Sequence, residues 1–124
     1  KANIKPVVDE FVSANKTETG YWAIHPGGVR IVEAVKESLQ LTEKNVEDSM
    51  TVLQNYGNMS SPTILFILHS ILNKLRNKDY SSDKNIFACA FGPGLTVEML
   101  LLSPIDASNF KNTLHPTTIY AVQE

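Results

Sequence analysis

The segment at 63–72, Thr-Ile-Leu-Phe-Ile-Leu-His-Ser-Ile-Leu, predicts a helix that is apolar on almost every side. Pro62 fits the first turn of this helix, where a missing N–H leaves no hydrogen bond unmade. A helix that is apolar all round belongs at the centre of a larger body, because no face of it suits water. Two more apolar segments, at 86–91 and 95–102, predict buried strands. This is a large inward-facing surface for 124 residues, and we expect neighbouring protein that these residues do not supply.

The remaining segments predict further helices and strands, with no internal repeat or linker between them. Apolar residues at helical spacing predict helices at 3–14 and 28–40, and a short aromatic run predicts a strand at 21–24. Another strand is predicted at 118–122. Together with the apolar segments described above, these elements predict an α/β or α+β fold with a small, mostly buried sheet.

Cap residues define the two helices in the middle of the chain. Thr42 is expected to cap a helix that carries Val46, Met50, Leu53 and Tyr56 inward and ends at Gly57. Ser60 or Ser61 is expected to cap the apolar helix that follows.

Composition excludes several classes of protein. Eleven basic and thirteen acidic residues give a net charge of −2, without the basic stripe that nucleic acid or an anionic membrane attracts. No apolar run approaches the about 20 residues that a membrane-spanning helix needs. A single cysteine excludes an internal disulfide framework and a cysteine-based metal site, and it suits the reducing cytoplasm. The chain begins Lys-Ala-Asn rather than with Met, and we expect it to be a piece of a longer protein.

Two polar side chains stand where a ligand could approach them. His25 follows the strand at 21–24 and precedes a Pro-Gly-Gly turn and a helix, a junction at which α/β sheets place ligand sites. Asn58 lies in the loop before the apolar helix, where an amide could donate to a developing oxyanion. Each residue could instead satisfy only the backbone of its own turn.

The other candidates for chemistry are weaker. Cys89 sits in an apolar strand without a base or a helix N-terminus to form its thiolate, which indicates an inert core residue. His69 and His115 have no carboxylate or cysteine at the spacing of metal ligands, and we expect no metal site.

Three motifs occur in a fixed order along the chain: Trp-Ala-Ile-His-Pro-Gly-Gly at 22–28, Tyr-Gly-Asn-Met-Ser-Ser at 56–61 and Phe-Gly-Pro-Gly-Leu-Thr-Val-Glu at 91–98. Together they resemble the C-terminal part of a type III polyketide synthase, the chalcone synthase-like family of the thiolase fold. The resemblance covers residues 1–103 as one domain and leaves a tail at 104–124. It implies the second half of a five-layered αβαβα fold, with a small mixed sheet packed against a buried central helix.

The resemblance also implies a chemistry. The family carries its growing chain on a cysteine and condenses malonyl-CoA onto it with loss of CO₂, starting from an acyl-CoA. His25 and Asn58 match the family's His and Asn, which hold the thioester oxygen. No cofactor other than these coenzyme A thioesters is implied, and the expected partners are a missing N-terminal half and a second copy in a cytoplasmic homodimer, with no nucleic acid and no membrane.

The remaining site residues implied by the resemblance would bind substrate. The stretch beside the pantetheine arm corresponds to Gly27, Gly28, Val29 and Arg30. Ser60 corresponds to a position that lines the acyl pocket, and the turn of Gly92, Pro93 and Gly94 to the loop that shapes the chamber where the chain folds.

One departure from the family decides what the chain could do alone. The family's nucleophilic cysteine is not among these residues, because Cys89 is not at a matching position, and we expect the fragment by itself to be inactive. Two alternatives stay open: a ketoacyl synthase-like enzyme that uses an acyl carrier protein, and a non-catalytic half-domain retained for dimerisation or binding.

Overall fold

The computed structural model describes residues 4–14, 19–81, 83–93, 96–103 and 120–122. The helices are α1 (Lys5–Ala14), α2 (Val29–Leu39), α3 (Glu43–Tyr56) and α4 (Pro62–Arg76). The strands are β1 (Thr19–Ile24), β2 (Asn85–Gly92), β3 (Thr96–Leu102) and β4 (Tyr120–Val122). Each expected element is present, with bounds within a few residues of those predicted.

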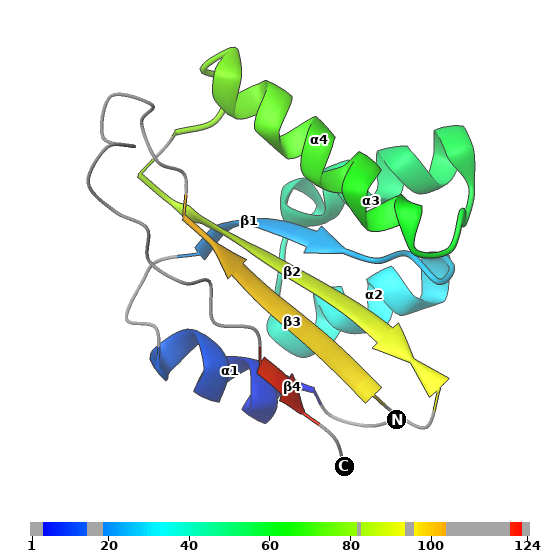
Figure 1. Ribbon diagram of the computed structural model, residues 1–124, viewed down its shortest axis with the longest axis vertical. Helices are drawn as coiled ribbons and strands as arrows, with labels where there is room; N and C mark the ends of the chain where they lie inside the picture. The colour runs from blue at the N-terminus through cyan, green and yellow to red at the C-terminus, as the bar shows by residue number, and fades with distance from the viewer. Residues whose placement is uncertain (1–3, 15–18, 82, 94–95, 104–119, 123–124) are drawn as a thin grey trace.

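The strands form one mixed sheet in the order β1-β2-β3-β4 (Figure 1). β1 runs parallel to β2, whereas β2 with β3 and β3 with β4 are antiparallel. The predicted small mixed sheet is therefore confirmed.

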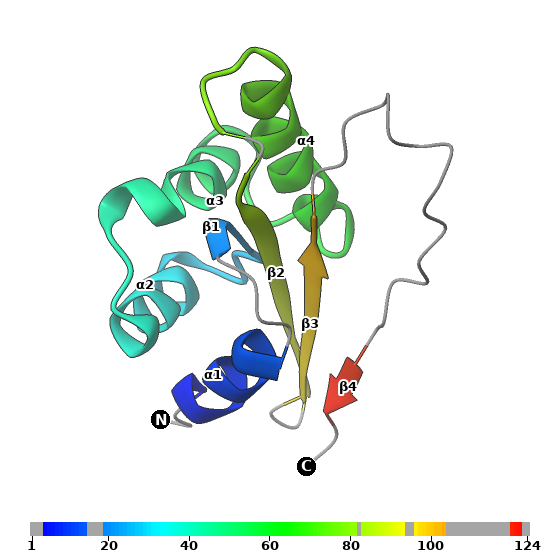
Figure 2. The same cartoon turned by 90° about the vertical axis from the view of Figure 1, so that its left-hand side faces the viewer.

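Helices cover both faces of the sheet, as the view turned by 90° in Figure 2 shows. Phe87, Cys89 and Met99 face a core shared with α1 and α2. The neighbouring residues Ile86 and Ala88 face the opposite way, toward α4. Because successive residues of a strand point to opposite faces, a strand covered on both sides is apolar throughout.

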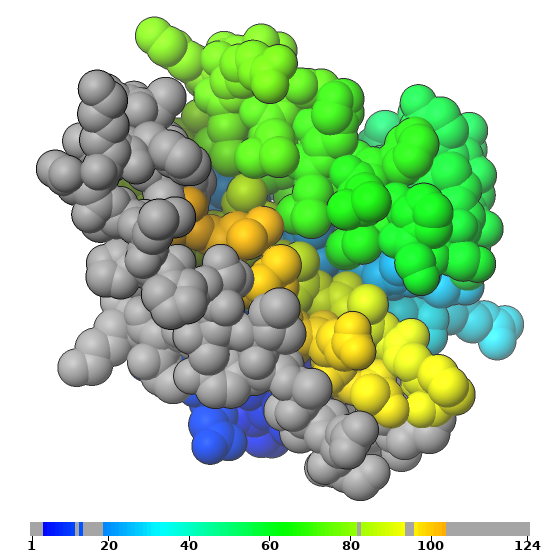
Figure 3. Space-filling view, viewed as in Figure 1, coloured from blue at the N-terminus to red at the C-terminus, as the bar shows by residue number. Residues whose placement is uncertain are grey.

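The apolar helix α4 buries one of its faces within this chain and exposes another. In α4, Thr63, Ile67 and Ile71 form one face that is buried against the sheet. Leu65, Phe66 and Leu72 are 63%, 42% and 49% exposed on the other side. In Figure 3, α4 (green) lies at the surface of the face shown. The described residues thus bury one face of α4, and burial of its other face in a larger body stays a prediction.

Helix α3 is capped as predicted but turns a different face inward. Thr42 and Asn45 form a capping box at its start, and Gly57, with φ of 69°, ends it. Tyr56 is 59% exposed, contrary to expectation. The buried face consists of Val46, Asp48, Ser49 and Val52. Two polar side chains, Asp48 and Ser49, therefore point into the protein.

Candidate active site

His25 lies where β1 leaves the sheet. Its backbone N–H donates to the carbonyl oxygen of Cys89 at 2.9 Å, so β1 stays hydrogen-bonded to β2 up to this residue. The buried Pro26 follows, and α2 begins at Val29. The imidazole is half-buried at the edge of the sheet where the parallel strands β1 and β2 both end.

The loop between α3 and α4 presents Asn58. Its Oδ1 accepts a hydrogen bond from the backbone N–H of Ser60 at 2.9 Å, the geometry of an Asx turn. Ser60 has a positive φ of 64°, which turns its peptide groups toward the end of β1. Ser61 occupies the expected N-cap position of α4 but makes no side-chain capping bond. Thr63 instead accepts from the N–H of Met59 at 2.8 Å.

The two candidate catalytic side chains meet at the backbone of Ser60. Nε2 of His25 lies 2.8 Å from the carbonyl oxygen of Ser60, and Asn58 holds the N–H of the same residue. A carbonyl oxygen only accepts, so Nε2 must carry the hydrogen and donate it. Asn58 uses Oδ1 in this turn, which leaves its Nδ2 as the group available to donate. Two polar side chains that are 33 positions apart in the sequence thus converge on the backbone of one residue, Ser60.

A cavity of about 390 Å³ opens beside His25. Its walls come from the end of β1, the start of α4 and the β2–β3 hairpin: His25, Ser60, Ser61, Ala90, Phe91, Gly92, Thr96 and Glu98. Of the predicted substrate-binding residues, Ser60 and Gly92 line it. Pro93 is exposed and accepts a hydrogen bond from the hydroxyl of Thr96 at 2.9 Å, and Gly94 lies outside the described residues.

The stretch of Gly27, Gly28, Val29 and Arg30 does not line this cavity. These residues lead into α2, and Val29 and Arg30 are exposed.

Sequence reasoning missed Thr96 and Glu98 as lining residues. Glu98 pairs with Ala90, and Thr96 pairs with Gly92, so both polar side chains share the face of two small residues. The signal was available, because Glu98 is a charged residue within an otherwise apolar strand. The small partners Ala90 and Gly92 leave the space that the cavity occupies.

Cys89 is an inert core residue, as predicted. It is buried in β2, and burial raises the pKa of its thiol to about 12. A thiol with such a pKa carries almost no thiolate near neutral pH and cannot act as a nucleophile.

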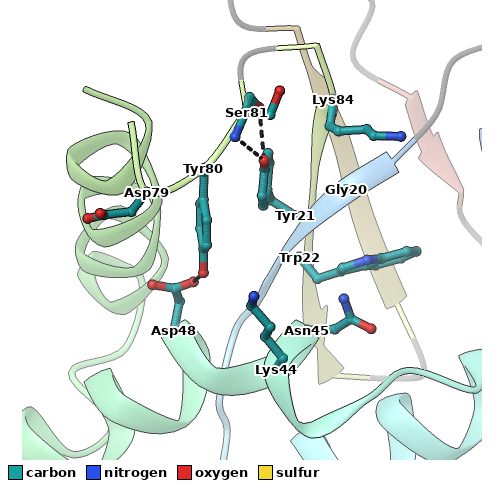
Figure 4. A pocket seen from close by; sticks show the side chains of 10 residues that line it. All are labelled: Gly20, Tyr21, Trp22, Lys44, Asn45, Asp48, Asp79, Tyr80, Ser81 and Lys84. Atoms are coloured by element: carbon teal, nitrogen blue, oxygen red, sulfur yellow. Dashed lines mark hydrogen bonds between the residues drawn. The ribbon is translucent and has the colours of Figure 1, made fainter. Parts of the chain in front are cut away.

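A second polar cluster, around Asp48, was not predicted (Figure 4). Asp48 is buried on α3 and accepts hydrogen bonds from Ser70 Oγ at 2.6 Å and Tyr80 OH at 2.7 Å. Lys74 Nζ lies 3.0 Å from its carboxylate. Tyr80 also stacks on Tyr21 of β1, with ring centroids 4.3 Å apart. A shallow cavity of about 330 Å³ adjoins this cluster.

The charges of the Asp48 cluster shift two pKa values. Burial and the hydrogen bond to Asp48 raise the pKa of Tyr80 to about 12. Burial lowers the pKa of Lys74, but its hydrogen bonds to Asp48 and Tyr80 outweigh that effect and leave the pKa raised. The carboxylate is thus paired and fully hydrogen-bonded, as a buried charge must be to persist.

The described part of the chain offers neither a membrane-spanning helix nor a metal cluster. None of its helices has the length and apolar character needed to cross a membrane. No group of three or more His, Cys, Asp or Glu side chains within it is arranged to hold a metal ion.

Known proteins are similar to this chain over most of its length, as the three motifs suggested. The family "Chalcone and stilbene synthases, C-terminal domain" matches residues 3–106. Type III polyketide synthase A of Arabidopsis thaliana is 36% identical over 88 residues, which are 71% of this chain and 22% of that protein. Type III polyketide synthase pspB of Penicillium soppii is 41% identical over 81 residues, which are 65% of this chain and 19% of that protein.

A solved structure agrees with these matches. The crystal structure of PKS-I from the brown alga Ectocarpus siliculosus matches with a TM-score of 0.73 and 34% identity, over 83% of this chain and 29% of that chain. This chain spans about a fifth of the length of the curated relatives that it matches. The resemblance to type III polyketide synthases and the thiolase-like fold class are confirmed, and the chain belongs to the family of chalcone and stilbene synthase C-terminal domains.

Proposed function

We propose that this chain supplies the residues that bind the thioester oxygen of the substrate in an acyltransferase site. The complete site condenses malonyl-CoA onto an enzyme-bound acyl thioester with loss of CO₂. The observation that supports this most directly is the meeting of His25 and Asn58 at the backbone of Ser60. Loss of CO₂ from a malonyl thioester leaves an enolate whose negative charge falls on the thioester oxygen. Two fixed N–H donors aimed at that oxygen stabilise it without any reorganisation during the reaction.

Each donor has a defined origin in the structure. The Nε2–H of His25 is directed at the carbonyl oxygen of Ser60. A thioester oxygen that entered the cavity would replace this carbonyl as the acceptor. Asn58 is exposed and is not among the residues that line the cavity. Its Oδ1 is occupied by the turn, so its Nδ2–H is the group that would serve as the second donor.

The nucleophile that carries the acyl group must come from outside the described residues. Cys89 is buried, and the pKa of its thiol is about 12, so it cannot form the acyl thioester. The relatives are four to five times longer than the matched segment. We therefore propose that the complete protein has an upstream part bearing the nucleophilic cysteine, and that this chain alone is inactive.

The proposed substrates are coenzyme A thioesters: malonyl-CoA and an acyl-CoA starter, with no further cofactor. The cavity beside His25 would take the acyl end, and the exposed residues 27–30 at the start of α2 would lie near the pantetheine arm. We propose that the complete protein acts in the cytoplasm, as a homodimer that binds neither nucleic acid nor membranes; the scarcity of cysteine in these 124 residues suits a reducing compartment.

Substitution of the two donors in the complete protein tests this proposal. His25→Ala and Asn58→Ala should each lower kcat for condensation by about 10²–10³, because each removes one donor from the developing oxyanion. Asn77→Ala is the matched control, since Asn77 is an exposed asparagine that follows α4, and it should leave kcat unchanged. Condensation is measured as CO₂ release and product formation from malonyl-CoA.

The same assay separates the alternatives. A strong preference for acyl carrier protein thioesters over coenzyme A thioesters would favour the ketoacyl synthase-like enzyme. Absence of any condensation by the complete protein would favour the non-catalytic half-domain. Turnover by this chain alone would contradict the assignment of the nucleophile to another segment.

A further inference from the structure

The buried hydroxyl of Ser49 connects α3, which leads to Asn58, with β1, which leads to His25. Ser49 is fully buried on α3, and its Oγ accepts a hydrogen bond from the backbone N–H of Ile24 at 3.0 Å. Ile24 directly precedes His25. Ser49 lies on the same helix that ends at Gly57 and leads into Asn58.

The geometry of β1 explains why this hydroxyl is needed. The N–H of His25 points toward β2, where it donates to Cys89. Along a strand, successive N–H groups point in opposite directions, so the N–H of Ile24 points away from β2. On that side the described sheet has no further strand, because β1 is its edge. Ser49 supplies the acceptor that a neighbouring strand would otherwise provide.

We propose that Ser49 is a positioning residue for the proposed reaction: it sets the end of β1, and with it His25, against the helix that leads to Asn58. This inference rests on the proposed function, because it concerns the spacing of the two donors. The last residues of β1 are held from both sides, by Cys89 and by Ser49. One hydrogen bond thus ties β1, which leads directly into His25, to α3, whose end leads into the loop of Asn58.

Loss of the hydroxyl should displace the donors rather than remove them. Ile24 is fully buried, so its N–H cannot turn to water in place of Ser49. The end of the strand must then move to find another acceptor. A displacement of about 1 Å at reacting groups can cost about 10²-fold in rate. Since Ser49 does not line the cavity, substrate affinity should change little.

Four variants of the complete protein test the inference. Ser49→Ala removes the acceptor, and Ser49→Cys replaces it with a weak one of similar shape in case the alanine variant does not fold. Both should lower kcat about tenfold or more, while KM for malonyl-CoA stays within about twofold. Ser49→Thr keeps the hydroxyl, and its kcat should stay close to that of wild type. Ser70→Ala is the matched control, since it removes a hydroxyl from the Asp48 cluster without touching β1.

The outcomes are distinct. The inference is overturned if Ser49→Ala and Ser49→Cys keep kcat within twofold of wild type. It is equally overturned if Ser70→Ala, at a similar loss of melting temperature, lowers kcat as much, because the effect is then general destabilisation. If His25→Ala and Asn58→Ala are themselves active, the proposed function fails first, and the role of Ser49 fails with it.

Discussion

At the scale of single residues, Ser60 has the least usual conformation in the candidate site. A positive φ is uncommon for a residue with a side chain and costs of order 1 kcal/mol or more. Here it places the carbonyl of Ser60 on His25 and its N–H on Asn58. The positive φ of Ser60 therefore fixes the backbone at which the two candidate side chains meet.

Cys89 gives a prediction about pH at the same scale. Its thiol has a pKa raised from 9.0 to about 12, so the folded state holds the proton more tightly than the unfolded chain. The contribution of this thiol to the free energy of unfolding is fully present below pH 9 and is lost as the pH rises toward 12. Over that range the equilibrium constant for folding falls by at most about tenfold per pH unit. In the Cys89→Ala variant, the loss of stability at alkaline pH should begin nearer pH 10. At that pH the next group, Tyr80, starts to ionise in the unfolded chain.

Urea unfolding between pH 8 and 11 measures this change. Wild type and Cys89→Ala should differ by a constant amount up to pH 9, and the difference should shrink above it. An identical pH dependence in both proteins would contradict the burial of the thiol.

At the scale of elements, the Asp48 cluster fastens α3 to α4 and to the segment that follows α4. The carboxylate of Asp48 binds Ser70 and Lys74 of α4 and Tyr80 beyond it, and Tyr80 stacks on Tyr21 of β1. Three segments are thus joined to the helix that also carries Ser49. The cluster stabilises the framework around the candidate site without lining the cavity beside His25.

Removing one partner from this cluster should therefore cost stability but not catalysis. Lys74→Met deletes the ammonium group and should lower the free energy of unfolding by about 1–3 kcal/mol, because the buried carboxylate loses a charged partner. Lys78→Met is the matched control, since Lys78 is exposed. Chemical denaturation gives the free energies. A loss no larger than that of the control would show that the pair is not stabilising.

At the scale of the whole molecule, α4 exposes a group of apolar side chains that we expect another protein surface to cover. Leu65, Phe66 and Leu72 are exposed on α4, and the ring of Phe66 packs on Tyr56 of α3 with centroids 5.1 Å apart. A protein rarely exposes a contiguous apolar patch that has no partner. The relatives extend far beyond this segment, and we propose that their additional residues, or a second copy, cover this face.

This face gives a prediction about association. The chain alone should form dimers or larger species in light scattering, because association buries the exposed apolar side chains. Leu65→Lys with Leu72→Lys should shift it toward monomer. Ile31→Lys, on α2, is the control and should leave association unchanged. A clean monomer for the unmodified chain would contradict the expectation that another protein surface covers this face.

The sequence by itself determined the elements and their order. Apolar spacing, caps such as Thr42 and Gly57, and the hairpin near Pro93 depend on local chemistry, and the structure confirms all of them. The three motifs identified the family, because their residue types, their order and their spacing can be read directly from the sequence. The sequence also drew attention to His25 and Asn58 before any geometry was known.

The tertiary structure alone decided which residues meet. The bond between His25 and Ser60, the tie from Ser49 to Ile24 and the buried charge of Asp48 join residues that are 22 to 35 positions apart. A periodic pattern assigns polar residues such as Asp48 and Ser49 to solvent, because it cannot see the partners that make their burial favourable. The one-sided exposure of α4 has the same origin, since burial is a property of what packs against a helix and not of the helix alone.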